Sequence, residues 1–164
     1  MQHIIIRDAH DDDFQAILDI NDGEVRHTSP MSVRRLSDLD QLSSYHKVAE
    51  VDGDVAAFLF AMRESVSYQN ENYEWFSSRY SKFLYIDRIV VDANYSGLKI
   101  GTKLYRDLFN YARSHQVFTI ACEYNVIPPN EPSRIFHEKF GFTEVGAQWL
   151  ANNAKRVSLQ AAEI

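Results

Sequence analysis

The segment from Tyr85 to Leu104, YIDRIVVDANYSGLKIGTKL, joins an apolar run to a turn that contains Gly97 and Gly101. It predicts a strand whose terminal turn opens directly onto an amphipathic helix. Backbone N–H groups in such a turn, and the positive end of the helix dipole, attract anions, and glycine lets a ligand approach the backbone closely. We therefore expect a diphosphate-binding turn here. Two glycines at this spacing also occur as ordinary punctuation between a strand and a helix, so other features of the chain must decide.

The composition favours a single domain and argues against a nucleic-acid-binding protein. The chain has 164 residues, of which 45% are hydrophobic, and this content is enough for one domain to bury its own core without disulfides or a structural metal. We expect a single domain over residues 1–164. The formal net charge of −6, together with the lack of a Lys/Arg cluster, argues against a nucleic-acid partner, because nucleic-acid-binding proteins usually carry a basic patch.

The cysteine count and the apolar runs bear on location. Cys122 is the single cysteine, so no internal disulfide can form and a reducing cytoplasm is favoured over a secreted setting. The longest apolar run, Val55 to Met62, is too short to span a bilayer, and the first residues do not resemble a targeting signal. The sequence predicts a cytoplasmic protein with no membrane partner.

Hydrophobic periodicity and turn residues predict the order of the elements. Strands are expected at 3–7, 47–51, 55–63, 83–91, 117–124, 142–149 and 156–160, and helices at 11–21, at 32–44, directly after the glycine turn and at 130–140. The Asp52-Gly53 pair is a strong hairpin signal. This order predicts an α/β (α+β) fold, with a mixed, mostly antiparallel sheet of about six to seven strands and helices on both faces.

The polar stretch between Glu64 and Ser81 is rich in aromatic residues and shows neither a helical nor a strand period. A long loop of this kind in a compact domain is often functional. An ordered surface loop whose rings cover the core is an equally good interpretation.

The predicted order, together with VVDANYSGLKIGTKLY and NEPSRIFHEKFGF, resembles the GCN5-related N-acetyltransferase (GNAT) superfamily, whose members transfer an acetyl group from acetyl-CoA to an amine. The likeness covers most of the chain and is strongest from Ile86 to Gly146. It implies the GNAT fold, acetyl-CoA (coenzyme A) as cosubstrate, and direct attack by a primary amine of a small molecule or peptide in a ternary complex. Many relatives pair through their terminal strands, which suggests a homodimer.

The family's pyrophosphate loop has a Gln or Arg, two residues, a glycine, one residue and a Gly or Ala. Ser96, Lys99 and Gly101 fall on these key positions, so two of the three differ from the pattern. Because Lys99 adds a Cβ, we expect the turn to avoid any conformation that only glycine tolerates. Its ammonium could contact a phosphate instead. A Walker-type nucleotide loop does not fit the glycine spacing.

The family also splays the strand before this loop from its parallel neighbour, so that backbone groups can pair with the pantetheine arm. The resemblance therefore assigns the coenzyme to Ile89, Val90, Val91, Ser96, Gly97, Leu98, Lys99, Ile100, Gly101, Thr102 and Asn130. Asn130 could equally be a helix N-cap.

Two side chains are candidates for moving protons. His137 stands where many relatives have a tyrosine that protonates the departing thiolate; it could act as acid or as base, or be a half-buried structural histidine. Asp87 matches a position where some relatives carry an acid that accepts the amine proton. A contact with Arg88 is not expected, because neighbouring strand residues point to opposite faces. Glu123 and Tyr124 are weaker candidates.

The resemblance gives the aromatic stretch a function as well. It would form a flap over the acceptor, with Tyr73, Trp75 and Tyr80 in contact with it. The histidines lack the spacing of metal ligands, so no metal is expected. The alternative function is a non-catalytic acyl-CoA-binding sensor or scaffold of the same fold, suggested by the altered loop and the missing tyrosine.

Overall fold

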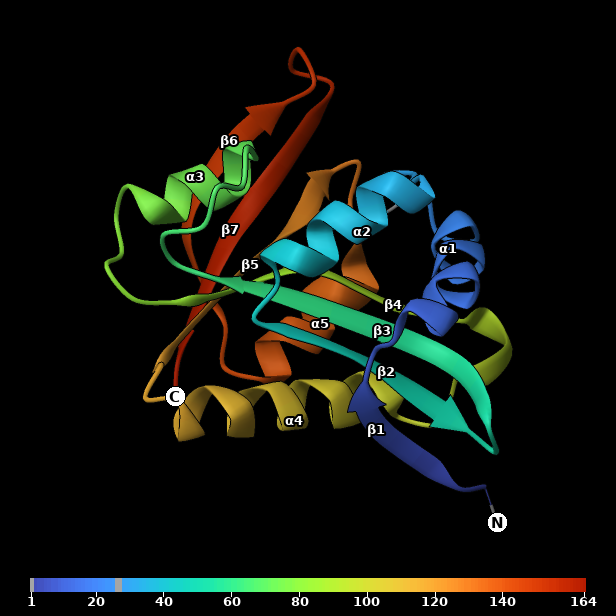
Figure 1. Ribbon diagram of the computed structural model, residues 1–164. Coiled ribbons are helices and arrows are strands. Elements are labelled where there is room, and N and C mark those ends of the chain that lie inside the picture. The colour runs from blue at the N-terminus through green and yellow to red at the C-terminus, as the bar shows by residue number, and fades with distance from the viewer. Residues whose placement is uncertain (1, 26–27) are drawn as a thin grey trace. The chain divides into compact units, whose positions relative to one another are not determined.

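The computed structural model describes residues 2–25 and 28–164. Seven strands form one sheet in the order β1-β2-β3-β4-β5-β7-β6 (Figure 1). The pairs β1–β2, β2–β3, β5–β7 and β6–β7 are antiparallel, whereas β4 (Leu84–Val91) and β5 (Thr119–Ile127) are parallel. This confirms the mixed, mostly antiparallel sheet predicted from the sequence.

The chain divides into two compact units, and β4 has residues in both. Unit 1 comprises Met1–Met62 and Ile86–Tyr111, and unit 2 comprises Arg63–Tyr85 and Ala112–Ile164. Besides its part of β4, unit 1 holds β1 (Ile4–Asp8), the 3-10 helix η1 (Asp11–Asp13), α1 (Phe14–Asp22), α2 (Val33–Leu42), β2 (Tyr45–Val51), the 3-10 helix η2 (Ala93–Tyr95) and most of β3 (Asp54–Arg63) and α4 (Ile100–Ser114).

The hairpin between β2 and β3 turns at the two predicted residues. Asp52 has φ 51° and Gly53 has φ 91°, so both lie in the left-handed region that a two-residue hairpin turn with the favoured twist requires. The Asp-Gly signal is therefore confirmed at the residue level.

Strand β2 shows that helices cover both faces of the sheet in unit 1. The Tyr45 hydroxyl and the Lys47 ammonium both donate to Asp107 of α4, at 2.8 and 2.7 Å. His46 lies between them in sequence and contacts Asp40 of α2 instead. Since successive strand residues face opposite sides, α4 covers one face and α2 the other (Figure 1).

Unit 2 is built around β5 and the closing hairpin. Besides β5 it contains α3 (Glu71–Ser77), α5 (Glu131–Lys139), β6 (Thr143–Leu150) and β7 (Lys155–Glu163). Leu84 and Tyr85 of β4 pair in parallel with Ile120 and Ala121, and β7 pairs antiparallel with both β5 and β6.

Helix α3 departs from the prediction, because the stretch between Glu64 and Ser81 is not a continuous loop. The Asn70 side chain caps the helix by accepting a hydrogen bond from the Tyr73 N–H, and acidic residues in the first turn favour the helix dipole. Tyr73 and Phe76 are 2% and 0% exposed, so rings of this segment do pack into the core. Two turns are too short for a clear hydrophobic period, which is why the helix was not predicted.

No helix within residues 2–25 and 28–164 has the length and apolar content needed to cross a membrane.

A buried histidine joins α2 to β2 in unit 1. The Nδ1 atom of His46 lies 2.6 Å from Oδ1 of Asp40, and the rings of Phe14 and Phe60 flank the imidazole. Burial lowers the pKa of His46, and the Asp40 carboxylate offsets only part of this effect, so the pKa stays below its usual 6.5.

This environment predicts a loss of stability in mild acid. The unfolded chain takes up a proton at His46 near pH 6.5, whereas the folded chain does so only at lower pH, so the free energy of unfolding falls as the pH drops through that window. We expect His46→Phe to lose less stability than the wild type between about pH 7.5 and 5.5. Urea denaturation at both pH values measures this, and an equal loss in the two proteins would contradict it.

Candidate functional site

The turn after β4 in unit 1 is held at its start by two hydrogen bonds of Asp92, one through its backbone and one through its side chain. The Asp92 N–H donates to the Ala56 carbonyl at 2.8 Å, and the Asp92 carboxylate accepts from the Asn94 N–H at 3.0 Å. These bonds begin the short helix η2, which leads into the segment that carries Gly97 and Lys99.

Two residues with positive φ reverse the chain into α4. Gly97 has φ 84° and Lys99 has φ 58°, and the Lys99 carbonyl accepts the hydrogen bond of the Lys103 N–H at 3.1 Å. The turn therefore enters the region that favours glycine at Lys99 rather than staying clear of it. A residue with a Cβ does so at a cost of about 1–2 kcal/mol. The strand must turn sharply to start the helix here, and that geometry outweighs the side-chain preference.

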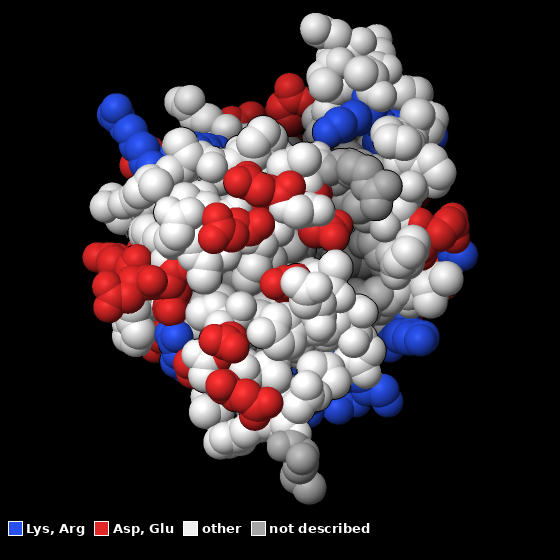
Figure 2. Space-filling view, turned by 90° about the vertical axis from the view of Figure 1, so that its right-hand side faces the viewer, with Lys and Arg blue, Asp and Glu red and all other residues white. Residues whose placement is uncertain are grey.

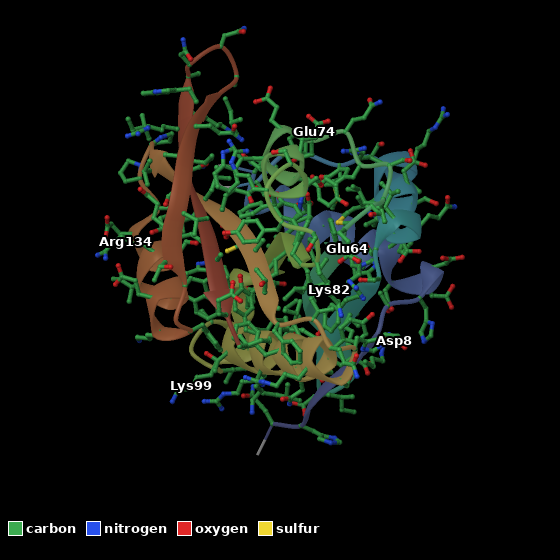
Figure 3. All side chains as sticks on the ribbon, turned by 90° about the vertical axis from the view of Figure 1, so that its left-hand side faces the viewer. Asp8, Glu64, Glu74, Lys82, Lys99 and Arg134 are labelled. Carbon is green, nitrogen blue, oxygen red and sulfur yellow. The ribbon has the colours of Figure 1, made fainter. Side chains whose placement is uncertain are left out.

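The first turn of α4 presents backbone donors. The N–H groups of Ile100, Gly101 and Thr102 have no acceptor within the helix. The first backbone N–H groups of any α-helix are in this position. This turn contains no acidic residue. The Lys99 side chain is exposed and extends away from the ribbon (Figure 3). The start of α4 therefore suits an anion such as a diphosphate.

Elsewhere on unit 1 the charge has the opposite sign. Figure 2 shows acidic side chains on the face that carries α1, and η1 and α1 contribute the exposed carboxylates of Asp11, Asp12, Asp19 and Asp22. This face would repel an anionic ligand.

Asp87 and Arg88 of β4 contact each other, contrary to the expectation from strand alternation. Nε of Arg88 lies 3.7 Å from Oδ2 of Asp87. Alternation fixes where a side chain leaves the backbone, but the long arginine side chain can bring its guanidinium back toward a neighbour. The same guanidinium donates to the Asn21 side chain and to the Ser29 carbonyl, at 3.0 and 2.7 Å, which ties β4 to α1 and the segment after it.

Glu123 of β5 lies at the centre of a polar network in unit 2. The Tyr85 hydroxyl lies 2.8 Å from each carboxylate oxygen of Glu123, and Nδ2 of Asn72 donates to Oε1 at 2.9 Å. Oδ1 of Asn72 in turn accepts from Nε2 of Gln148 at 2.8 Å. The sequence ranked Glu123 below Asp87 and gave no signal for Asn72 or Gln148, since both belong to the network only through the packing of α3 and β6.

His137 of α5 is more deeply buried than predicted, with 5% exposure. Its Nδ1 lies 2.6 Å from the Ser133 carbonyl, an acceptor, so Nδ1 carries a proton and donates it. Burial lowers the pKa of His137, and the Ser133 carbonyl offsets only part of this effect. The rings of Tyr124, Phe136 and Phe142 surround the imidazole at centroid distances of 5.8, 5.4 and 5.2 Å. The histidine is therefore mainly neutral at pH 7.

Asn130 caps α5, which was one of the two interpretations of this residue. Its side-chain oxygen accepts from the Ser133 N–H at 3.4 Å. This bond uses the side-chain oxygen of Asn130. A contact between its side-chain NH₂ group and the coenzyme stays a prediction.

The three predicted acceptor contacts differ in accessibility. The Tyr73 hydroxyl donates to the Arg63 carbonyl at 2.8 Å and accepts from the Val66 N–H, so its polar end is used within the core. Trp75 is partly exposed, and the Arg79 guanidinium lies over its ring at 4.0 Å. Tyr80 is also partly exposed.

The described residues favour neither a metal site nor a cysteine nucleophile. Among the described residues, no group of three or more His, Cys, Asp or Glu side chains could hold a metal ion. Cys122 is buried, and burial raises the pKa of its thiol, which disfavours a thiolate. Burial also raises the pKa of Tyr124 in β5.

The model of the Acetyltransferase (GNAT) family matches residues 6–142. Among solved structures, Ard1 from Thermoplasma volcanium has a TM-score of 0.79 at 15% identity, over 98% of this chain and 97% of that chain. The ribosomal-protein-S18-alanine N-acetyltransferase from Escherichia coli has a TM-score of 0.76 at 17% identity, over 99% and 94%. Arabidopsis thaliana Naa50, in complex with the bisubstrate analogue CoA-Ac-MVNAL, has a TM-score of 0.74 at 15% identity, over 98% and 99%. At such identities these structures show a shared fold. No curated protein matches the chain.

The packing of Trp75 on Gly146 gives a testable consequence. A Cβ at Gly146 would lie 2.3 Å from Cζ2 of Trp75. Gly146→Ala should therefore lower the free energy of unfolding by about 1–3 kcal/mol through overpacking. In a Trp75→Ala background the added methyl group has space, and the same substitution should cost much less. Denaturant melts of the four proteins test this, and an equal cost in both backgrounds would rule out the clash.

Proposed function

This chain belongs to the acetyltransferase (GNAT) family, and on that premise we propose that it is an acetyl-CoA-dependent N-acetyltransferase acting on a primary amine of a small molecule or peptide. Residues 1–164 would act as one catalytic domain. The observation that carries the proposal is the start of α4, where Gly97 and Lys99 turn the chain so that successive backbone N–H groups are available to an anion.

Two stretches of unit 1 would hold the coenzyme. The backbone amides of residues 96–102 would bind its diphosphate, with the Lys99 ammonium adding charge from outside the turn. The backbone of Ile89, Val90 and Val91 would pair with its pantetheine amides, as the family resemblance implies. Bound acetyl-CoA would supply an activated acetyl group. The acceptor amine would attack the thioester carbonyl directly in a ternary complex, so that a C–N bond forms, the C–S bond breaks and the coenzyme leaves as its thiolate.

We propose that Glu123 accepts the proton that the acceptor ammonium must lose. Its carboxylate is partly exposed and is oriented by two neutral donors, Tyr85 and Asn72. A carboxylate in this setting can take a proton directly or through one water. Asp87 is the weaker candidate, because its side chain is 4% exposed and lies beside the Arg88 guanidinium.

The environment of His137 favours a base over an acid. Because Nδ1–H donates to the Ser133 carbonyl, Nε2 of the neutral ring carries the lone pair. Donating a proton to a thiolate would require the imidazolium form, which burial disfavours. We propose that His137 at most accepts a proton and otherwise supports the packing of α5.

The partly exposed Trp75 and Tyr80 remain the proposed acceptor contacts on the aromatic segment. Tyr73 instead supports the core beneath them, since its ring and hydroxyl are both engaged there.

The alternative is a non-catalytic acyl-CoA-binding module. The observation in its favour is that a neutral, buried histidine stands where many family members have a tyrosine acid. Such a module would bind acetyl-CoA without releasing free thiol from it.

Turnover separates the two functions. Incubated with acetyl-CoA and a panel of primary amines, the wild type should release free thiol steadily. Glu123→Gln should lower kcat/KM by about 10²–10⁴-fold while the coenzyme Kd stays within about twofold. His137→Ala should have a smaller effect, and Glu74→Gln, on the exposed side of α3, serves as the control. Coenzyme binding without turnover on any amine would favour the module, and the absence of binding would rule out both.

The contribution of Lys99 can be separated from that of the backbone. Lys99→Gly relieves the left-handed strain and keeps the amide, so it should hold coenzyme affinity within a few fold and leave stability unchanged or higher. Lys99→Glu keeps the strain and reverses the charge, and we expect about a tenfold weaker Kd by calorimetry. A larger loss in Lys99→Gly than in Lys99→Glu would contradict recognition by the backbone.

A further inference from the structure

Helix α3 contacts the Glu123 carboxylate by two routes, both within unit 2. The direct route is the 2.9 Å hydrogen bond from Nδ2 of Asn72 to Oε1. The indirect route runs through Tyr73, whose ring packs edge-on against Tyr85 with centroids 5.7 Å apart and planes at 76°. The Tyr85 hydroxyl then reaches both carboxylate oxygens. A displacement of α3 would therefore disturb these two donors to Glu123.

The orientation of the Asn72 amide is set by β6. Nε2 of Gln148 donates to Oδ1 of Asn72, which leaves Nδ2 directed at Glu123. Asn72 is 6% exposed, so water competes little for these bonds. Hydrogen bonds to a charged group in such a setting are stronger than those between neutral groups. The donor sequence Gln148 to Asn72 to Glu123 thus links β6, α3 and β5.

The place of α3 against β6 depends on a glycine. Trp75 lies where a Cβ of Gly146 would be, so the absence of that side chain is what lets the helix approach the strand. Gly146 also follows a register shift in the ladder between β6 and β7, which begins after Glu144. The ring contact and the hydrogen-bond chain therefore hold α3 at two neighbouring points of β6.

We propose that α3 is a positioning element for the proton acceptor, with Asn72, held by Gln148, orienting the Glu123 carboxylate and stabilising its charged form. This inference rests on the proposed function in which Glu123 takes the acceptor proton. Asn72 and Gln148 are positioning residues, because they act through Glu123. The titratable groups near Glu123 include Tyr85 of β4, which hydrogen-bonds it, and Cys122 beside it in β5, and the contact from α3 is neutral.

The chain offers an isosteric test with a matched control. Asn72→Asp removes the donor and places a second carboxylate beside Glu123, so the acidic limb of the kcat/KM profile should move up by about one pH unit or more. Asn72→Leu removes the donor without adding charge and should move the limb less, in the same direction. Asn70→Asp makes the same chemical change on the same helix but keeps a good N-cap, so its profile should match that of the wild type.

Thermal melts establish that each variant is folded. If folded Asn72→Asp and Asn72→Leu both give the profile of Asn70→Asp, the inference is overturned. A general loss of kcat with no movement of the limb in either Asn72 variant would overturn it too, since this would mark a purely structural residue.

A second readout does not depend on activity. With ¹³C-labelled glutamate, the side-chain carboxyl signal of Glu123 is the one lost in Glu123→Gln, and its titration midpoint should rise in Asn72→Asp but not in Asn70→Asp. Without turnover on any amine the proposed function fails, and this titration still tests the link between α3 and Glu123. With turnover but an unmoved midpoint in Asn72→Asp, the inference alone fails.

Discussion

The reversal of the chain between β4 and α4 is the constraint on which the proposed chemistry depends. The chain must change direction between the end of β4 at Val91 and the start of α4 at Ile100. Gly97 and Lys99 make this reversal with positive φ. The left-handed backbone at Lys99 costs free energy. In return, the turn leaves the first N–H groups of α4 available to a ligand. A strained residue beside N–H groups that have no acceptor within their own helix is an arrangement that ligand binding can explain.

The proton-handling groups of unit 2 depend on packing rather than on backbone geometry. Glu123 is oriented by donors from β4 and α3, and α3 is held in turn by contacts with β6. Burial instead makes His137 a neutral ring in an aromatic cage. Glu123 and His137 thus belong to the same unit but have different surroundings. Hydrogen-bond donors contact the Glu123 carboxylate, whereas aromatic rings surround the His137 imidazole.

Local signals in the sequence were enough for the fold but not for all of the site. The Asp52-Gly53 turn, the apolar face of α4 and the Asn130 cap follow from rules that act within a few residues, and the structure confirms them. Contacts between residues that are distant in sequence could not be predicted from such local rules. The network of Asn72 with Gln148 joins positions 76 apart, and the Arg88 contacts with Asn21 join positions 67 apart. Helix α3 was not predicted because seven residues show too little periodicity.

The central claim is that main-chain amides at the start of α4 hold the coenzyme's diphosphate, and amide NMR tests it most directly. Titration of ¹⁵N-labelled protein with coenzyme A should move the N–H signals of Gly97, Ile100, Gly101 and Thr102 more than those of the exposed α1 surface. The same four signals should move less with pantetheine, which lacks the diphosphate. Saturable binding that leaves these four signals in place, or equal shifts with both ligands, would contradict the account.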